Sequence, residues 1–162
     1  MDMKIKIAFV GKAGSGKTKL ADFIKKEYRF KDLHFAMPVK EIAYRYFDAR
    51  EKNRELLQKI GGLMRTIDPL VWVNCMKRSI ETSPHSMLVI DDCRYINEAK
   101  MLKELGFTLI KLEGRQWELP EDQANDTSET ELENIMADRI LDTSKPLEVT
   151  QKELIDIIYE RA

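Results

Sequence analysis

The chain has 162 residues and is almost neutral, with 27 lysines and arginines against 28 aspartates and glutamates. Apolar residues make up 43% of it, which is enough at this length for a core without disulfide or metal support. A near-neutral charge argues against a protein that lies along a nucleic-acid backbone or an anionic membrane. We therefore expect one compact domain that binds small molecules and neither nucleic acid nor membranes.

Short apolar runs alternate along the chain with segments of helical spacing. The runs are β-branched or aromatic and too short for helices, whereas the segments between them repeat apolar residues every three or four positions. In chain order the pattern predicts a strand at 4–10, a helix at 18–28, a short apolar stretch at 33–36, a helix from 38 to about 46, a strand at 86–90, a helix at 98–105, a strand at 107–112, a weaker strand at 139–141 and a helix at 153–159. Strands that alternate with helices indicate a parallel sheet covered on both faces, a three-layer α/β/α domain.

A helical insertion is predicted from about 37 to 82. Pro38 suits the first turn of its first helix. We expect breaks at Gly61-Gly62 and at Asp68-Pro69, where Asp68 can cap the next helix and Pro69 can occupy its first position. The insertion is well placed to hold a second small ligand.

A long loop without periodicity follows the strand predicted at 107–112. It runs from about 113 to 130 and contains Arg115, Trp117 and then an acidic polar stretch. Loops of this length in compact domains are usually lids, binding loops or disordered segments. We predict a lid here.

Cysteine and histidine are scarce. Cys75 and Cys93 form no disulfide framework, and with His34 and His85 they show no zinc-ligand spacing. The N-terminus lacks the apolar run of a signal peptide, and no stretch reaches the ~18 uncharged residues that span a bilayer. The sequence predicts a cytoplasmic protein and leaves open whether it is a monomer or a homodimer.

The strongest motif follows the first predicted strand. Its eight residues fill every position of the Walker A pattern G-x-x-x-x-G-K-[ST]: Gly11, Lys12, Ala13, Gly14, Ser15, Gly16, Lys17 and Thr18. A loop of this kind points backbone N–H groups at phosphates, and the following helix adds the positive end of its dipole. The lysine can then reach the β- and γ-phosphates of ATP, and the hydroxyl of Thr18 can ligate Mg²⁺.

Carboxylates and arginines are expected at the same edge of the sheet. The apolar strand at 86–90 ends in Asp91-Asp92, where doubly wound sheets bind ligands. Neighbouring strand residues point to opposite faces, so the two aspartates are not expected to share one role. We expect Arg94 and Arg115 to lie close enough to this edge to reach the phosphates. Guanidinium groups can neutralise the negative charge that develops during phosphoryl transfer.

Several further stretches, in order, resemble bacteriophage-type deoxynucleoside monophosphate kinases of the P-loop nucleoside monophosphate kinase-like group. They are Phe35-Ala36-Met37-Pro38-Val39-Lys40-Glu41, Leu56-Leu57-Gln58-Lys59-Ile60-Gly61 with Arg65 and Asp68-Pro69-x-x-Trp72, Asp92-Cys93-Arg94-Tyr95-x-Asn97-Glu98-Ala99, and Ser128-Glu129. This resemblance implies ATP and Mg²⁺ at the P-loop and a deoxynucleoside 5′-monophosphate in the helical insertion.

The resemblance also implies roles for individual residues. It places Lys40, Arg65, Trp72, Asp92 and Arg94 in the acceptor pocket and Arg115 with Ser128-Glu129 in the lid, so Glu129 is also expected to bind substrate. It favours Asp92 over Asp91 as the carboxylate that serves the metal with Thr18, although Asp91 stays open. Together with the P-loop and the charges at the sheet edge, this makes Lys17, Arg94 and Arg115 the expected catalytic residues. The chain departs from the family pattern at Asp91, Cys93 and Gly62, which leaves the base of the acceptor open.

Two other interpretations remain. Animal-type phosphomevalonate kinases share the P-loop, the Pro-Val-Lys-Glu stretch, the Asp-x-Arg pair and the Ser-Glu pair, so another phosphorylated metabolite is the alternative acceptor. A P-loop protein that binds nucleotide without catalysis is the second alternative. The Leu-Leu-Gln-x-x-Gly and Asp-Pro-x-x-Trp stretches favour the nucleoside monophosphate.

Overall fold

The computed structural model describes residues 4–49, 53–116, 118 and 130–160. Their elements are β1 (Ile5–Val10), α1 (Lys17–Tyr28), β2 (Lys31–Leu33), α2 (Ala36–Phe47), α3 (Arg54–Ile67), α4 (Val71–Glu81), β3 (Met87–Cys93), α5 (Ile96–Glu104), β4 (Thr108–Glu113), the 3₁₀-helix η1 (Glu131–Asn134), β5 (Arg139–Asp142) and α8 (Leu147–Glu160). The chain forms two compact units. We call residues 1–33 with 84–162 the sheet unit and residues 34–83 the helical unit.

The sheet unit contains five parallel strands in the order β2-β3-β1-β4-β5. From β1 the chain passes through α1 to β2, which lies on one side of β1. From β3 it passes through α5 to β4, which lies on the other side of β1. Strand order therefore reverses at β1, and such a switch point opens a ligand-binding crevice at the carboxyl ends of the strands. The loop after β1, which carries the Walker A residues, begins at this point.

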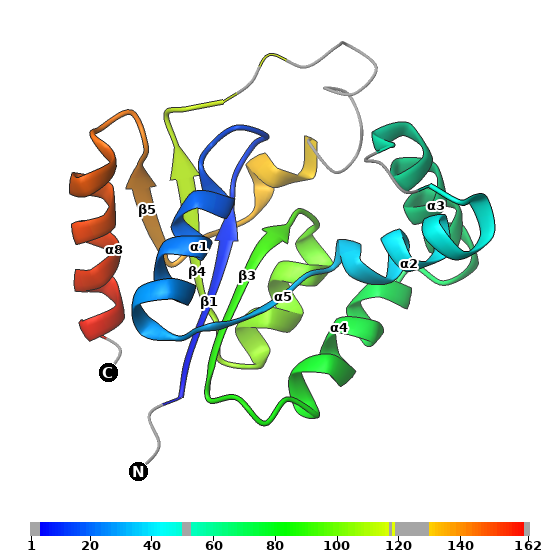
Figure 1. Ribbon diagram of the computed structural model, residues 1–162, viewed down its shortest axis with the longest axis horizontal. Coiled ribbons are helices and arrows are strands. Elements are labelled where there is room, and N and C mark those ends of the chain that lie inside the picture. The colour runs from blue at the N-terminus through cyan, green and yellow to red at the C-terminus, as the bar shows by residue number, and fades with distance from the viewer. Residues whose placement is uncertain (1–3, 50–52, 117, 119–129, 161–162) are drawn as a thin grey trace. The chain divides into compact units, whose positions relative to one another are not determined.

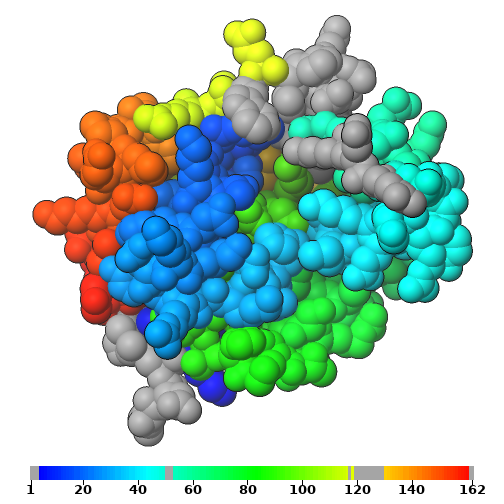
Figure 2. Space-filling view, viewed as in Figure 1, coloured from blue at the N-terminus to red at the C-terminus, as the bar shows by residue number. Residues whose placement is uncertain are grey.

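Helices cover both faces of this sheet (Figure 1). On one face, α1 and α8 pack over a core built from alternate strand residues, among them Phe9, Val89 and Ile110. On the other face, Leu102 of α5 and Leu132 of η1 are buried. Figure 2 shows α1 and α8 at the surface, where their outward residues, such as Lys26 and Asp156, are exposed. The predicted three-layer α/β/α architecture is confirmed.

Strand β3 continues through both aspartates and contains an irregularity beside them. Its pairing with β1 shifts between Ala8, which faces Ile90, and Val10, which faces Cys93. β3 thus holds one residue more than β1 over this stretch, as in a β-bulge, and bulges re-aim side chains next to active sites. The strand delivers Asp91 and Asp92 at the edge where the P-loop begins.

The helical unit consists of α2, α3 and α4. Asn53 caps α3 by accepting a hydrogen bond from the backbone N–H of Leu56 (3.0 Å). The expected break at Gly61-Gly62 is wrong, because α3 runs unbroken through both glycines. The indole Nε1–H of Trp72 donates to the Gly61 carbonyl (3.1 Å), which links α4 to α3.

Helix α4 starts later than predicted. The carboxylate of Asp68 accepts from the Leu70 N–H (2.9 Å), and the Asp68 carbonyl accepts from the Val71 N–H (3.1 Å). Pro69 therefore lies in a turn before the helix, not at its first position. Helix α8 begins at Leu147, earlier than the expected 153. The sequence pattern missed its first turn because that turn is exposed and lacks the apolar spacing that marks the rest of the helix.

No helix among the residues that the structure describes has both the length and the apolar character required to cross a bilayer.

Gly114, at the end of β4, provides a test of this packing. Its φ is +110°, and a Cβ there would lie 2.7 Å from the backbone nitrogen of Ser144. We predict that Gly114→Ala lowers the free energy of unfolding by about 1–3 kcal/mol, because it combines a strained φ with a backbone clash. Urea unfolding followed by circular dichroism measures the change.

Gly62→Ala is the matched control. A Cβ at Gly62 meets nothing within 4 Å, and the residue lies inside α3. Alanine should therefore stabilise the protein by about 0.5–1 kcal/mol, because glycine is entropically costly in a helix. Equal effects of the two substitutions would contradict the close approach between β4 and the loop before α8.

Candidate functional site

The P-loop connects β1 to α1 and folds into a compact backbone cradle. Gly14 and Gly16 have φ values of +80° and +99°, which side-chain-bearing residues rarely adopt. The Ser15 N–H donates to the Lys12 carbonyl (3.2 Å), and Gly16 directly precedes α1. The loop thus leads into the positive end of a twelve-residue helix.

Lys17 lies within this loop rather than in solvent. Its side chain is buried, and Nζ donates to the carbonyl oxygens of Gly11 (2.6 Å) and Lys12 (2.8 Å). These hydrogen bonds hold the ammonium group against the P-loop backbone. A fixed positive charge beside a cradle of N–H groups is suited to phosphate oxygens.

The first turn of α1 is hydrogen-bonded to the end of β3. The Thr18 hydroxyl donates to Oδ2 of Asp91 (2.9 Å), and Asp91 is buried. The sequence-based preference for Asp92 as the metal-side carboxylate does not match this geometry, because the structure brings Asp91 to the P-loop threonine. The shifted register of β3 and the alternation of strand side chains account for the difference.

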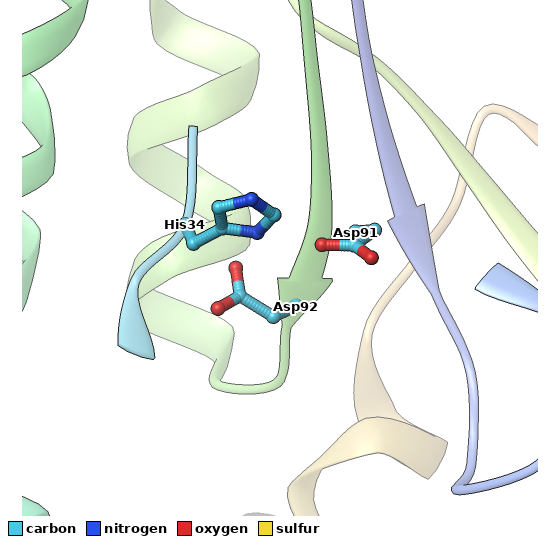
Figure 3. A group of neighbouring side chains, drawn as sticks. All are labelled: His34, Asp91 and Asp92. Atoms are coloured by element: carbon cyan, nitrogen blue, oxygen red, sulfur yellow. The ribbon is translucent and has the colours of Figure 1, made fainter. Parts of the chain in front are cut away.

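Figure 3 shows Asp91 and Asp92 on opposite sides of β3, with His34 on the side of Asp92. His34 directly follows β2, whose last residue, Leu33, pairs with Ile90 of β3. One ligand atom from each of the three side chains lies within 4.8 Å of the others. Mg²⁺ prefers oxygen ligands alone, so this mixed group does not by itself define a magnesium site.

Arg94 lies in the two-residue connection between β3 and α5. Its backbone N–H donates to Oε2 of Glu98 (2.9 Å), and the Tyr95 N–H donates to the same oxygen (3.2 Å). Glu98 is only 2% exposed, so a buried carboxylate fixes this connection from inside α5. Burial, and then the charge of Glu98, raises the pKa of the adjacent Cys93 thiol well above its usual range, which agrees with a packed, neutral thiol.

The 3₁₀-helix η1 contributes two more carboxylates. Glu131 accepts a hydrogen bond from the Ile96 N–H (3.0 Å), the first residue of α5. Glu133 forms an exposed ion pair with Lys12 of the P-loop (2.8 Å). The Lys12 ammonium lowers the pKa of the Glu133 carboxyl below its usual value, through their hydrogen bond first and then through its charge.

Arg115 lies just beyond β4 and is exposed. Its backbone N–H donates to the Thr143 hydroxyl (3.1 Å), and its guanidinium donates to the Lys145 carbonyl (3.3 Å). These contacts hold Arg115 against the loop before α8.

Three predicted acceptor residues belong to the helical unit. Lys40 is exposed on α2. Arg65 lies on α3 over Gly61, since a Cβ at that glycine would be 3.2 Å from the guanidinium nitrogen NH1. Trp72 is buried and, through its bond to the same glycine, joins α4 to α3. Gly61 thus leaves room for the Arg65 guanidinium on one side, and its carbonyl accepts the bond from Trp72.

Part of the predicted lid lies outside the described residues. This applies to Trp117, Ser128 and the predicted substrate residue Glu129.

Sequence reasoning brought Asp91 to the ligand-binding edge but preferred Asp92 for the metal, and it missed the contacts of Glu98, Glu131 and Glu133. Asp91 was detectable, because it is the first polar residue after the apolar run of β3. Glu98 had a pattern as well, since an acid in the first turn of a helix is typical of N-terminal capping. No sequence pattern marked Glu131 or Glu133, because acidic residues in a polar stretch do not show which amide or ammonium group they will contact.

The chain resembles known proteins in both sequence and fold. No family model matches the chain. A protein of Acanthamoeba polyphaga mimivirus named "Putative deoxynucleotide monophosphate kinase" is 27% identical over 188 aligned residues, covering 94% of this chain and 95% of that protein.

Two solved structures share the fold. The gluconokinase from Sinorhizobium meliloti 1021 has a TM-score of 0.54 at 14% identity, covering all of this chain and 99% of its own. A sugar kinase from Janibacter sp. HTCC2649 has a TM-score of 0.57 at 16% identity, covering 98% of this chain and 96% of its own. The near-complete alignment with the viral protein confirms the resemblance to deoxynucleoside monophosphate kinases that the sequence motifs indicate.

Proposed function

We propose that the chain transfers the γ-phosphoryl group of ATP to the 5′-phosphate of a deoxynucleoside monophosphate, giving ADP and the diphosphate. The observation that carries the proposal is the complete P-loop, whose Thr18 hydroxyl lies 2.9 Å from a buried aspartate at the end of β3. The name of the viral relative and the acceptor-side motifs support this class of acceptor.

The nucleotide side follows from the P-loop. Residues 11–18 would cradle the phosphates with their backbone N–H groups, and Lys17 would place its ammonium against the β- and γ-phosphates. Lys17 is already held at the loop by the Gly11 and Lys12 carbonyls, so little ordering of its side chain is required. Positioning and charge, rather than covalent chemistry, are what phosphoryl transfer demands of the protein.

The residues beside the P-loop fit a magnesium ion. The Thr18 hydroxyl and the Asp91 carboxylate offer hard oxygen donors 2.9 Å apart, and Mg²⁺ is bound by such groups and by water. We assign the metal-side role to Thr18 and Asp91, in place of Thr18 and Asp92. When bound, the ion would neutralise charge on the β- and γ-phosphate oxygens.

Because this assignment gives the metal-side role to Asp91, Asp92 is available to bind the acceptor. It lies on the opposite side of β3 from Asp91, and the resemblance places it at the acceptor together with Arg94 (Figure 3). Lys40, Arg65, Trp72 and Glu129 complete the acceptor residues that the resemblance implies. Arg115 keeps the catalytic role expected from the sequence, although its guanidinium donates to the Lys145 carbonyl in this structure.

The acceptor supplies its own nucleophile. A phosphate monoester has a second pKa of about 6, so an oxygen of the 5′-phosphate is largely ionised at neutral pH. It attacks the γ-phosphorus while the bond from that phosphorus to the β–γ bridging oxygen breaks, and ADP leaves. No general base is required, unlike a kinase that phosphorylates a hydroxyl group.

A transfer assay tests this function. The protein is incubated with γ-labelled ATP, Mg²⁺ and, in separate reactions, the deoxynucleoside and ribonucleoside monophosphates, phosphomevalonate and gluconate. We expect label in a nucleoside diphosphate, with deoxynucleotides preferred. Label in phosphomevalonate or gluconate would identify another kinase, free phosphate would identify a hydrolase, and retention of all label in ATP would indicate a binding protein.

Paired variants test the assignment of the two aspartates. We expect Asp91→Asn to raise the Mg²⁺ concentration for half-maximal activity by about tenfold, because an amide is a weaker ligand than a carboxylate, with little change in acceptor KM. Asp92→Asn should instead raise the acceptor KM. Both variants are measured by steady-state kinetics at several Mg²⁺ concentrations. The reverse pattern would assign the metal-side role to Asp92 instead.

A further inference from the structure

The connection that carries Arg94 is held by carboxylates from two separate parts of the chain. The N–H groups of Arg94 and Tyr95 donate to Glu98, which belongs to α5 itself. The next N–H, that of Ile96, donates to Glu131, which is 35 residues away in sequence on η1. Three consecutive amides at the start of α5 are therefore engaged by two acidic side chains.

This arrangement decides how the start of α5 can act. Backbone N–H groups at a helix N-terminus commonly bind phosphate. Here those of residues 94–96 already donate to protein carboxylates, so in this arrangement a phosphate would be met by the Arg94 side chain rather than by these amides. The backbone bonds then serve to aim Arg94.

Helix η1 is anchored independently of its acidic side chains. Leu132 is 1% exposed and Ile135 is 4% exposed, so apolar burial docks this segment on the sheet unit. Just beyond, Asp138 exchanges two hydrogen bonds of 2.8 Å with the backbone of Leu109, at the beginning of β4. A change at Glu131 should therefore leave the fold in place.

We propose that Glu131 is a positioning residue for Arg94: by holding the Ile96 amide, it fixes the β3–α5 connection and with it the arginine that receives the acceptor phosphate. The inference rests on the proposed function for the identity of that acceptor. Glu131 acts through the backbone and touches neither substrate.

If Glu131 acted through its charge alone, its removal would have the opposite effect on acceptor binding. A carboxylate near an anion-binding arginine repels a phosphate, so removing it should strengthen acceptor binding if charge were its only influence. If Glu131 instead aims Arg94, removing it should weaken acceptor binding. The sign of the change therefore separates the two roles.

The experiment compares Glu131→Ala, Glu131→Gln and Glu133→Ala with wild type, and uses Arg94→Ala as the reference for loss of the arginine. Glu133→Ala is the matched control, because Glu133 lies on the same short helix but bonds to Lys12 instead of α5. KM is measured for both substrates, the dissociation constant of the preferred monophosphate by calorimetry, and amide exchange of residues 94–98 by mass spectrometry.

We expect Glu131→Ala to raise the acceptor KM and dissociation constant by about three- to tenfold, with ATP KM changed by less than about twofold. Exchange at residues 94–98 should become at least about fivefold faster. Glu131→Gln should remain close to wild type, since its amide oxygen can still accept from the Ile96 N–H. Glu133→Ala should leave the acceptor KM within about twofold of wild type.

Three results would overturn the proposal. The first is faster exchange in Glu131→Ala with unchanged or tighter acceptor binding. The second is an equal loss of acceptor binding in Glu133→Ala, which would indicate general loosening of η1. The third is a Glu131→Gln variant as impaired as Glu131→Ala.

Failure of the proposed function has a different signature. If the wild type neither transfers phosphate to a monophosphate nor binds one, the proposed function and the positioning role both fall. If the wild type transfers normally and only the Glu131 variants depart from expectation, the positioning role alone is wrong.

Discussion

The hydrogen bond between the Thr18 hydroxyl and the buried Asp91 carboxylate is the contact on which the site depends. It joins the first turn of α1 to the last residues of β3, with the P-loop between them. Because β1 and β3 are parallel neighbours, their carboxyl ends meet at one edge of the sheet. The shifted register of β3 then turns one aspartate toward the P-loop and leaves the next on the other side of the strand.

Acidic side chains do much of the local organisation around this contact. Glu98 and Glu131 hold the backbone that carries Arg94, and Glu133 holds Lys12. Each accepts a hydrogen bond from a backbone amide or pairs with an ammonium group, and so helps to fix the position of a positively charged residue. Carboxylates near the proposed phosphate site would cost electrostatic energy, so we explain their presence by the positions that they fix.

The sequence was sufficient to predict the P-loop, the alternation of strands and helices, and the edge of the sheet where the site lies. These features depend on local spacing, which a single sequence displays. The expected break at Gly61-Gly62 failed because glycine propensity was outweighed by packing, with Trp72 bonded to the Gly61 carbonyl. The choice between Asp91 and Asp92 depended on strand register, and the contacts of Glu131 depended on tertiary structure, neither of which is visible in local spacing.

The kinetics of a Lys17→Met variant test the central claim most directly. Methionine fills a similar volume in the buried position but removes the ammonium that the Gly11 and Lys12 carbonyls hold at the P-loop. We predict that kcat for phosphoryl transfer falls by at least about 10²–10³-fold while circular dichroism and the thermal midpoint remain close to wild type. A folded variant that keeps more than about a tenth of the wild-type kcat would contradict the assignment of this loop as the phosphate-binding site.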